Sequence, residues 1–239
     1  MFRPTARVVV MRVLVFGTHP DDETIGMGGT ICKHTRRGDE VMVCCMTDGS
    51  GGGLKGYTQP GVTGPQLSEI RKEELKAACR VMGVSKIEFG WYEDGFLFLN
   101  EGSLIKTGNL IRSYKPDRVY VQFGDVPVGS TNLDHIEQYR IVVEALQKVR
   151  WPNYPKLGAE VCHVKQIYAY GLNIASGVAD SFVDITDVAD LKRKALECYK
   201  SQGYWKLGES WGAQDKILGI TSGIGEYVEG FKTLRALLL

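Results

Sequence analysis

Residues Val13–Thr30 read VLVFGTHPDDETIGMGGT, and the change of pattern inside this stretch decides the fold. Its first part belongs to the apolar run Val8–Phe16, which β-branched residues dominate, as in a strand that is covered on both faces. A polar turn begins at Thr18 and leads into the start of a helix. A strand, a turn and a helix in this order form the first half of a βαβ unit, so we expect an α/β fold.

Short β-branched runs alternate with segments of helical period along the rest of the chain. The runs that we expect to form strands are Val8–Phe16, Glu40–Met46, Lys86–Trp91, Arg118–Phe123 and Val164–Tyr170. Because each run is almost continuously apolar, helices should cover both faces of the sheet. The alternation predicts a mainly parallel central sheet, in which the first and fourth strands can be neighbours.

Apolar residues at helical spacing predict the buried faces of two helices between these strands. These faces consist of Leu67, Ile70, Ala78 and Val81 in one helix, and of Ile136, Tyr139, Val143 and Leu146 in the other. Asp187 is expected to be the N-cap of a later helix, and Gly225–Leu239 is expected to form a C-terminal helix.

Length and composition limit the kind of protein. The chain has 239 residues, and we expect residues 1–239 to be a single domain, with residues 1–10 as a candidate N-terminal extension. A hydrophobic fraction of 44% and a charged fraction of 24% are those of a globular chain and exclude disorder. The net charge of +1 provides no basic excess, so neither nucleic acid nor an anionic membrane is an expected partner.

The apolar and cysteine patterns favour the cytoplasm. The longest apolar run is interrupted by Arg12 and is shorter than the roughly 18 residues that a membrane span needs. The pattern of a secretory signal is not present. The six cysteines are scattered through apolar stretches without a CxxC pair, so we expect reduced thiols and a cytoplasmic location.

The turn Thr18–Glu23 concentrates the chemistry, because it holds one imidazole and three carboxylates at the carboxyl edge of a strand. His19 and Asp22 are three residues apart at a helix entry, which can bring both side chains to one side. A divalent metal such as zinc takes such a mixed set of ligands, commonly three from the protein. The alternative is a helix start with solvated acids, since Asp and Glu favour the first turn.

His135 is the best-placed third ligand among the four histidines. It follows the polar loop after the fourth strand and opens a helix, with Asp134 beside it. Because the carboxyl ends of the first and fourth strands would converge, His135 should approach the turn. A helix cap or a surface histidine is the alternative. We expect His34 to be solvated, and His163 lies in a poorly defined segment.

Several further motifs follow the HPDDE turn in order. They are Met46–Gly49, Arg71–Glu74, Glu93–Gly95 and Phe182–Thr186. Together these blocks resemble the GlcNAc-phosphatidylinositol de-N-acetylase family, the zinc deacetylases that are called PIG-L or LmbE-like. The similarity covers about residues 11–235, and several ordered motifs are more specific than any single one.

The resemblance implies that His19, Asp22 and His135 bind the metal, with Zn²⁺ expected and another divalent metal as the alternative. It also implies that Asp21 is the general base. The chemistry agrees, because an amide carbonyl is a poor electrophile that a metal polarises, and a metal also lowers the pKa of the attacking water. Asp21 could take the proton of this water and later deliver it to the leaving amine.

The second metal motif departs from the family pattern. Relatives commonly have His-Pro-Asp-His, whose first histidine stabilises the tetrahedral oxyanion, whereas this chain has Asn132-Leu133-Asp134-His135. Asn132 is the candidate catalytic residue here, because its amide could donate a hydrogen bond to the oxyanion. Loss of one such donor costs on the order of 3 kcal/mol. The alternatives are His163, a residue of a neighbouring subunit, or weak activity.

Arg71 and Asp94 are the candidate substrate-binding residues. Arg71 could hold a hydroxyl or an anionic group, and Asp94 could accept hydrogen bonds from sugar hydroxyls. The alternatives are a surface arginine and a turn aspartate. Trp91, Tyr92 and Phe96 could form an aromatic platform for a sugar ring, although core packing is favoured.

Two glycine-rich segments superficially resemble nucleotide-binding loops. The segment GSGGGLKG (residues 49–56) lacks the Gly-Lys-Ser/Thr ending, and Gly26–Gly29 lacks the last glycine of a dinucleotide fingerprint. We interpret the first as a mobile active-site loop and the second as a place of close helix packing.

These observations predict a Rossmann-like three-layer sandwich with a mainly parallel central sheet and a C-terminal helical extension. We expect a metal-dependent N-deacetylase that removes the acetyl group from an N-acetylglucosamine-type sugar or its conjugate. The alternatives are a non-sugar N-acyl substrate, a weakly active metal-binding relative, and a nucleotide-binding Rossmann module without a hydrolytic role. The resemblance also implies a homo-oligomer, a trimer or a hexamer.

Overall fold

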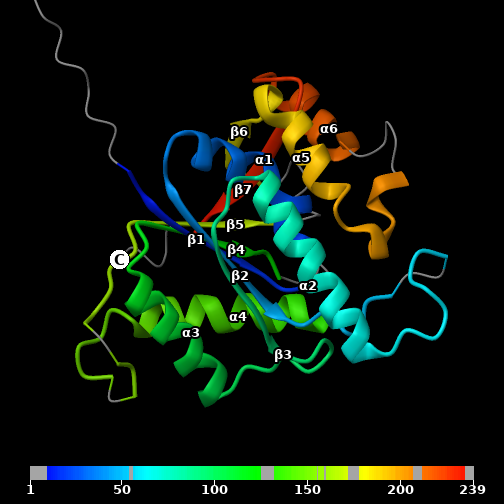
Figure 1. Ribbon diagram of the computed structural model, residues 1–239. Helices are drawn as coiled ribbons and strands as arrows, with labels where there is room; N and C mark the ends of the chain where they lie inside the picture. The colour runs from blue at the N-terminus through cyan, green and yellow to red at the C-terminus, as the bar shows by residue number, and fades with distance from the viewer. Residues whose placement is uncertain are drawn as a thin grey trace, which may run out of the picture.

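The computed structural model describes residues 10–53, 56–124, 132–154, 156–158, 160–171, 178–206 and 212–234. Within these residues a central sheet lies between two layers of helices (Figure 1). The predicted α/β sandwich is therefore confirmed. Among the described helices, none has the combined length and apolar character that crossing a bilayer requires.

The central sheet places the first and fourth strands side by side. Its described strands are β1 (Arg12–Gly17), β2 (Glu40–Thr47), β3 (Lys86–Tyr92), β4 (Arg118–Gln122), β5 (Gln166–Tyr170), β6 (Ser181–Asp184) and β7 (Val228–Thr233). They lie in the order β3-β2-β1-β4-β5-β7-β6. Strands β1 to β5 are parallel, whereas β7 is antiparallel to β5 and to β6. All five predicted strands are present, with ends that differ by a few residues.

The helices form two layers on opposite faces of this sheet (Figure 1). One layer contains α1 (Asp22–Arg36), α2 (Gly64–Val81) and α5 (Ala189–Leu196), and the other contains α3 (Glu101–Tyr114) and α4 (Leu133–Lys148). Helix α6 (Ala213–Ser222) packs against β7, and short 3₁₀ turns occupy Thr186–Val188, Lys200–Gln202 and Tyr204–Lys206. Each layer closes its own apolar core against the sheet.

The prediction of a C-terminal helix was wrong. Residues 228–233 of the predicted C-terminal helix form strand β7, which pairs with both β5 and β6. The described helical part of this region, α5 to α6, lies between β6 and β7 rather than at the end. The N-cap of α5 is Val188, so the prediction that Asp187 caps this helix was wrong. The carboxylate of Asp187 instead forms an ion pair with Lys33 at 2.9 Å.

The buried faces of two helices differ from the predicted faces. In α2, Leu67 and Ala78 are buried as expected, but Ile70 is 40% exposed. Leu146 is the one residue of the predicted α4 face that is buried. The buried residues of α4 are Asp134, His135, Gln138, Ile141, Val142, Ala145 and Leu146. Apolar spacing missed this face because its first turn buries polar side chains.

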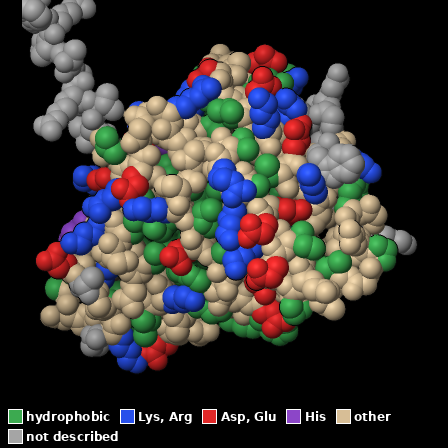
Figure 2. All heavy atoms as spheres, viewed as in Figure 1, with side chains coloured by type: hydrophobic (Ala, Val, Ile, Leu, Met, Phe, Trp, Pro, Cys, Tyr) green, Lys and Arg blue, Asp and Glu red, His purple; other side chains and the backbone are tan. Residues whose placement is uncertain are grey.

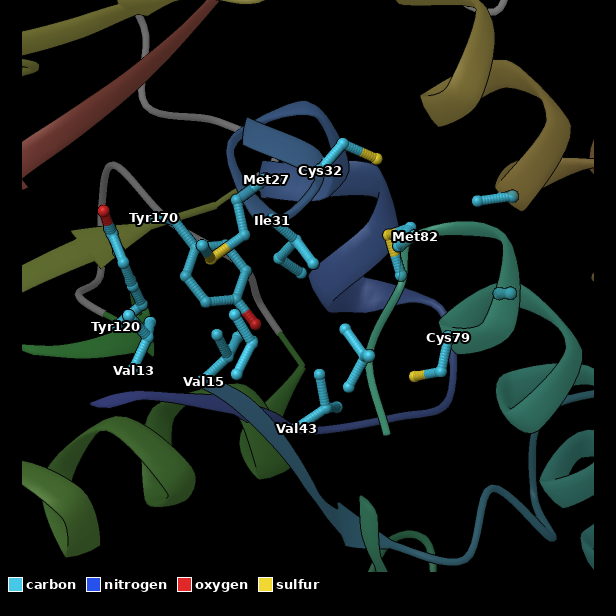
Figure 3. Packing of buried hydrophobic residues seen from close by; sticks show 14 of the residues in the cluster. Val13, Val15, Met27, Ile31, Cys32, Val43, Cys79, Met82, Tyr120 and Tyr170 are labelled. Atoms are coloured by element: carbon cyan, nitrogen blue, oxygen red, sulfur yellow. The ribbon is translucent and has the colours of Figure 1, made fainter. Parts of the chain in front are cut away.

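Strand β1 lies at the centre of the core. Val13 and Val15 contact the layer of α1, where Met27 and Ile31 cover them (Figure 3). Cys79 belongs to the same cluster, and the six cysteines are all free, as expected for reduced thiols. Burial of this kind removes the side chains of β1 after Arg12 from solvent, so the turn that follows the strand has a rigid base.

Helix α1 is kinked at Met27, with a glycine on either side of the kink. Met27 has non-helical dihedral angles, and the helix restarts after it. Glu229 of β7 caps the restart, because its carboxylate accepts from the backbone N–H groups of Gly29 (2.9 Å) and Thr30 (2.7 Å). A Cβ atom at Gly26 would lie 2.5 Å from the Tyr170 ring. The predicted close packing of this glycine segment is therefore confirmed.

The surface carries mixed charge. On the face shown in Figure 2, Lys and Arg side chains are interspersed with Asp and Glu, and large regions of one sign do not occur there. This pattern agrees with the net charge of +1.

Candidate metal centre

The turn after β1 is held from both neighbouring strands. The Thr18 carbonyl accepts hydrogen bonds from the Thr47 backbone N–H (2.9 Å) and hydroxyl (2.8 Å) at the end of β2. The Thr18 backbone N–H donates to Oε1 of Gln122 at the end of β4 (3.2 Å). Asp21 has a φ of 145°, a strained value for a residue with a side chain. These contacts fix the turn at the carboxyl edge of the sheet.

His19, Asp22 and His135 meet at this edge, although His135 comes from α4. Nδ1 of His19 lies 3.2 Å from Oδ2 of Asp22 and 3.1 Å from Nε2 of His135. Nε2 of His135 lies 3.2 Å from the same Asp22 oxygen. All three side chains are buried. The sequence prediction that the first turn and the fourth loop converge is confirmed as geometry.

This triangle of ligand atoms fits a tetrahedral ion. Zinc binds nitrogen and oxygen ligands at about 2.0–2.1 Å, so the corners of its tetrahedron are about 3.3–3.4 Å apart. The three observed separations, 3.1, 3.2 and 3.2 Å, are close to one face of such a tetrahedron. Two imidazoles and one carboxylate are also a ligand set that zinc accepts.

Two carboxylates orient His19 from behind. Nε2 of His19 lies 3.2 Å from Oδ1 of Asp94 and 3.6 Å from Oδ2 of Asp134. Burial opposes a positive imidazole, but contacts with Asp134, Asp22 and Asp94 raise the pKa of His19 well above its ordinary value. The site therefore favours a cation, and a carboxylate behind a ligand histidine fixes the tautomer that binds metal.

Asp134 was not recognised as an orienting residue from the sequence. Its carboxylate accepts from the backbone N–H groups of Gly95 (2.6 Å) and Leu97 (3.3 Å), so α4 is bonded to the loop after β3. Nε2 of Gln122 lies 3.4 Å from Nδ1 of His135 on the other side of the site. Both contacts join segments far apart in the chain, so local sequence patterns do not reveal them.

Asp21 lies beside the triangle and is held by Arg71. Nη2 of Arg71 lies 3.2 Å from Oδ2 of Asp21 and also donates to the Pro20 carbonyl (3.1 Å), and Nη1 donates to the Gly49 carbonyl (3.0 Å). Burial raises the pKa of Asp21 to about 8, although the guanidinium of Arg71 opposes this shift. A carboxylate with a pKa near neutrality suits proton transfer. The Tyr204 hydroxyl is a further neighbour of Asp21.

The two predicted substrate-binding residues differ in placement. Arg71 is 3% exposed, and its terminal nitrogens contact protein groups, so it is not a surface arginine. Asp94 keeps more exposure at the edge of the site, where its carboxylate accepts from Gly51 N–H at 3.2 Å and faces His19. Trp91 and Tyr92 pack against the core of the α3 and α4 layer. The favoured alternative of core packing is thus confirmed for these two rings.

Asn132 caps α4, and His163 and His34 lie outside the triangle. Oδ1 of Asn132 accepts from the Asp134 backbone N–H at 2.9 Å, so this residue is the N-cap of α4. His163 is exposed and precedes β5, so it lies at the amino edge of the sheet, away from the triangle. The prediction that His34 is solvated was wrong. His34 is 5% exposed and contacts Asp39 at 2.6 Å.

The glycine-rich loop contacts a segment near the C-terminal end of the chain. Nε2 of Gln202 donates to the Gly52 carbonyl at 2.7 Å, and the Ser201 hydroxyl donates to Glu74 of α2 at 2.7 Å. The 3₁₀ turn Lys200–Gln202 therefore contacts both the glycine-rich loop and α2. Residues 54–55 of the loop lie outside the described residues.

The chain is similar to known proteins in sequence and in fold. The sequence profile of the GlcNAc-PI de-N-acetylase (PIG-L) family matches residues 14–146. Diacetylchitobiose deacetylase of Thermococcus kodakarensis is 30% identical over 209 residues, which cover 84% of this chain and 75% of that protein. The structure of N,N'-diacetylchitobiose deacetylase from Pyrococcus horikoshii matches with a TM-score of 0.83 at 30% identity, over 95% of this chain and 85% of that chain.

A relative with a different reaction also matches. The 4-oxalmesaconate hydratase of Pseudomonas putida is 27% identical over 232 residues, which cover 92% of this chain and 88% of the hydratase. The family profile spans more than half of the chain, and the Thermococcus deacetylase reaches 30% identity. The chain is therefore an enzyme of the GlcNAc-PI de-N-acetylase (PIG-L) family, whose deacetylases hydrolyse amide bonds.

Proposed function

We propose that this enzyme is a zinc-dependent N-deacetylase that acts on an N-acetylglucosamine-type sugar or its conjugate and releases acetate and a free amine. The observation that carries the proposal is the buried triangle of His19, Asp22 and His135 with Asp21 beside it. The deacetylase relatives support the sugar substrate.

His19, Asp22 and His135 would hold the ion. When bound, zinc supplies a Lewis acid that polarises the acyl oxygen and lowers the pKa of the attacking water. Asp94 and Asp134 fix the ring of His19, and Gln122 lies against the ring of His135. The carboxylates behind His19 also compensate the positive charge of an ion in this buried site.

Asp21 moves the proton in this proposal. Its carboxylate accepts a proton from the attacking water and returns it to the nitrogen of the leaving amine. Arg71 keeps the carboxylate in place through Nη2, and we infer that Arg71 acts through Asp21 rather than on the substrate. Asp94 remains the candidate to accept hydrogen bonds from the sugar, because it lies at the edge of the site.

Asn132 remains the candidate oxyanion donor. Its Oδ1 accepts from the Asp134 backbone N–H, and its amide nitrogen is the atom that could donate to an oxyanion. The cap fixes this side chain three residues before His135, at the first turn of α4. A neutral amide is a weaker donor than a cationic imidazole, so we expect a slower reaction than in relatives with histidine there.

Acetate release tests the proposed reaction. The zinc-loaded protein is assayed with N-acetylglucosamine, diacetylchitobiose and acetamide, and the expected result is turnover of an acetylated sugar well above acetamide. Turnover of acetamide alone would favour the non-sugar amidase. Hydration of 4-oxalmesaconate without any acetate release would refute the deacetylase and align the chain with its Pseudomonas relative.

The predictions of a homo-oligomer and of a cytoplasmic location stay as predictions. Sedimentation of the purified protein checks the first, because a trimer or hexamer has three or six times the 26.5 kDa mass of one chain. A species of single-chain mass at micromolar concentration would refute the oligomer.

A further inference from the structure

The two histidines of the triangle differ in what lies behind the ring. His19 turns Nδ1 toward the triangle, and its Nε2 faces the carboxylates of Asp94 (3.2 Å) and Asp134 (3.6 Å). His135 turns Nε2 toward the triangle, and its Nδ1 lies 3.4 Å from the side-chain amide of Gln122. One imidazole is therefore backed by hydrogen-bond acceptors and the other by an amide.

The amide of Gln122 presents its nitrogen, which is a donor, to His135. The Thr18 backbone N–H can only donate, and the amide atom 3.2 Å from it is therefore Oε1. Nε2 of Gln122 thus lies on the side of His135, 3.4 Å from Nδ1 and 3.5 Å from Nε2 of the ring. Gln122 is 2% exposed, so solvent has little access to this amide.

A histidine that binds an ion through Nε2 cannot accept a hydrogen bond from this amide. A neutral imidazole carries one proton and one in-plane lone pair. When Nε2 gives its lone pair to an ion, the proton lies on Nδ1, which then faces the Gln122 amide as a second donor. Two donors form no hydrogen bond, so the contact with Gln122 is lost in the ion-bound protein.

The contacts of His135 instead favour a proton on Nε2. This nitrogen lies 3.2 Å from Oδ2 of Asp22, which can accept its hydrogen bond. Nδ1 is then the acceptor for the Gln122 amide. Ion binding through Nε2 must therefore shift the proton to Nδ1 and give up both hydrogen bonds. His19 needs no such exchange, because the carboxylates behind it accept from Nε2 when Nδ1 binds the ion.

We propose that Gln122 is a positioning residue that holds His135 in the tautomer with its proton on Nε2 and thereby keeps the ion of the triangle exchangeable. This role rests on the proposed function, because it acts on the ion of that metal centre. The cost falls on the ion-bound protein, where the buried amide loses its acceptor. Partners of ligand histidines typically change metal affinity 10–100-fold.

Zinc affinity measured by chelator competition, with no substrate present, tests the proposal. In Gln122→Glu one oxygen can keep the Thr18 N–H, and the other takes the place of the amide nitrogen and can accept from Nδ1 of His135. We expect this variant to bind zinc about 10–100-fold more tightly than the wild type. The matched control is Gln166→Glu at the start of β5, where the side chain accepts from Arg118, and its zinc affinity should equal that of the wild type.

Gln122→Met separates the hydrogen bond from the added charge, and it replaces the Glu variant should that protein fail to fold. Methionine has a similar length and removes the donor without adding a carboxylate. The metal-free variant has no amide contact for ion binding to break, so zinc should bind about threefold to tenfold more tightly than in the wild type.

Nitrogen NMR of the four histidines gives a spectroscopic signature of the tautomer. The measurement is made at about pH 8.5, above the ordinary histidine pKa of about 6.5. In the metal-free wild type we expect the proton of His135 on Nε2, and addition of zinc should move it to Nδ1.

Three results would overturn the role of Gln122 and leave the metal centre intact. One is equal zinc affinity in the wild type, Gln122→Glu and Gln122→Met. Another is tighter binding in Gln122→Glu without any gain in Gln122→Met, which would assign the effect to charge. The third is a proton on Nδ1 of His135 in the metal-free wild type. Absence of zinc binding in all three proteins would refute the metal centre itself, and the role of Gln122 with it.

Discussion

Replacement of Asp21 by Asn changes the proposed proton acceptor with almost no change of shape. Asparagine tolerates the positive φ of 145° about as well as aspartate does, and its carbonyl oxygen can still accept from Arg71. The substitution removes one partner of a buried ion pair, which is destabilising, but the Arg71 guanidinium keeps its hydrogen bonds to the Gly49 and Pro20 carbonyls and lies 3.9 Å from Asp94. We therefore expect a lower thermal midpoint in a protein that still folds.

The expected effect of Asp21→Asn on activity is large. A positioned general base contributes about 10²–10⁴-fold to a reaction rate, so kcat for acetate release should fall by that factor. Asp21 is not a corner of the triangle of His19, Asp22 and His135, so the zinc content should stay at the wild-type level. Activity and metal content are thus expected to separate.

The assay combines acetate release with zinc analysis of the same preparation. Glu73→Gln is the matched control, because it changes an exposed carboxylate of α2 that pairs with Lys76 on the same helix. Activity of Asp21→Asn within tenfold of this control would refute the role of Asp21 as base. Loss of zinc in Asp21→Asn would show that Asp21 is itself a ligand.

Three further predictions address metal affinity and stability. His19 should lose its orienting contact in Asp134→Asn, so zinc affinity measured by chelator competition should fall about 10–100-fold, and an unchanged affinity would contradict this. Glu229→Gln should lower the free energy of unfolding by about 1–3 kcal/mol in urea titration, since it weakens the cap at Thr30, and an unchanged midpoint would refute that role. Burial lowers the pKa of His34, and the unfolded chain takes up this proton near pH 6.5 while the folded chain does not. Stability should therefore fall as the pH drops below about 6.5, and His34→Gln should flatten this part of the profile; equal slopes in both proteins would contradict it.

The order of strands, turns and helices follows from local sequence patterns, and these patterns predicted most of the sheet. An apolar β-branched run such as that before Gly17 can only be buried, and parallel strands bring their carboxyl ends to one edge. His19 and His135 could therefore be assigned to one site from their positions after the first and fourth strands. The ligand triangle follows from topology plus residue type.

The end of the chain shows where local pattern is insufficient. Residues 228–233 read VEGFKT, with a glycine and two charged residues. This pattern does not predict a strand that pairs with two other strands. Its Glu229 caps α1, about 200 residues earlier in the chain, and bonds Lys192 at 2.9 Å. Only packing against β5, β6 and α1 determines that role.

The sequence by itself predicted the α/β class and the edge of the sheet that carries the candidate site, because periodicity and strand order encode them, and the family resemblance implied the three side chains of the triangle. The tertiary structure alone decided that Asp94 and Asp134 lie behind His19 and that Arg71 holds Asp21. These contacts join side chains from separate segments at distances of a few ångströms. The local sequence pattern does not specify which side chains of separate segments come close together. The folded chain brings these side chains into contact by burying both partners.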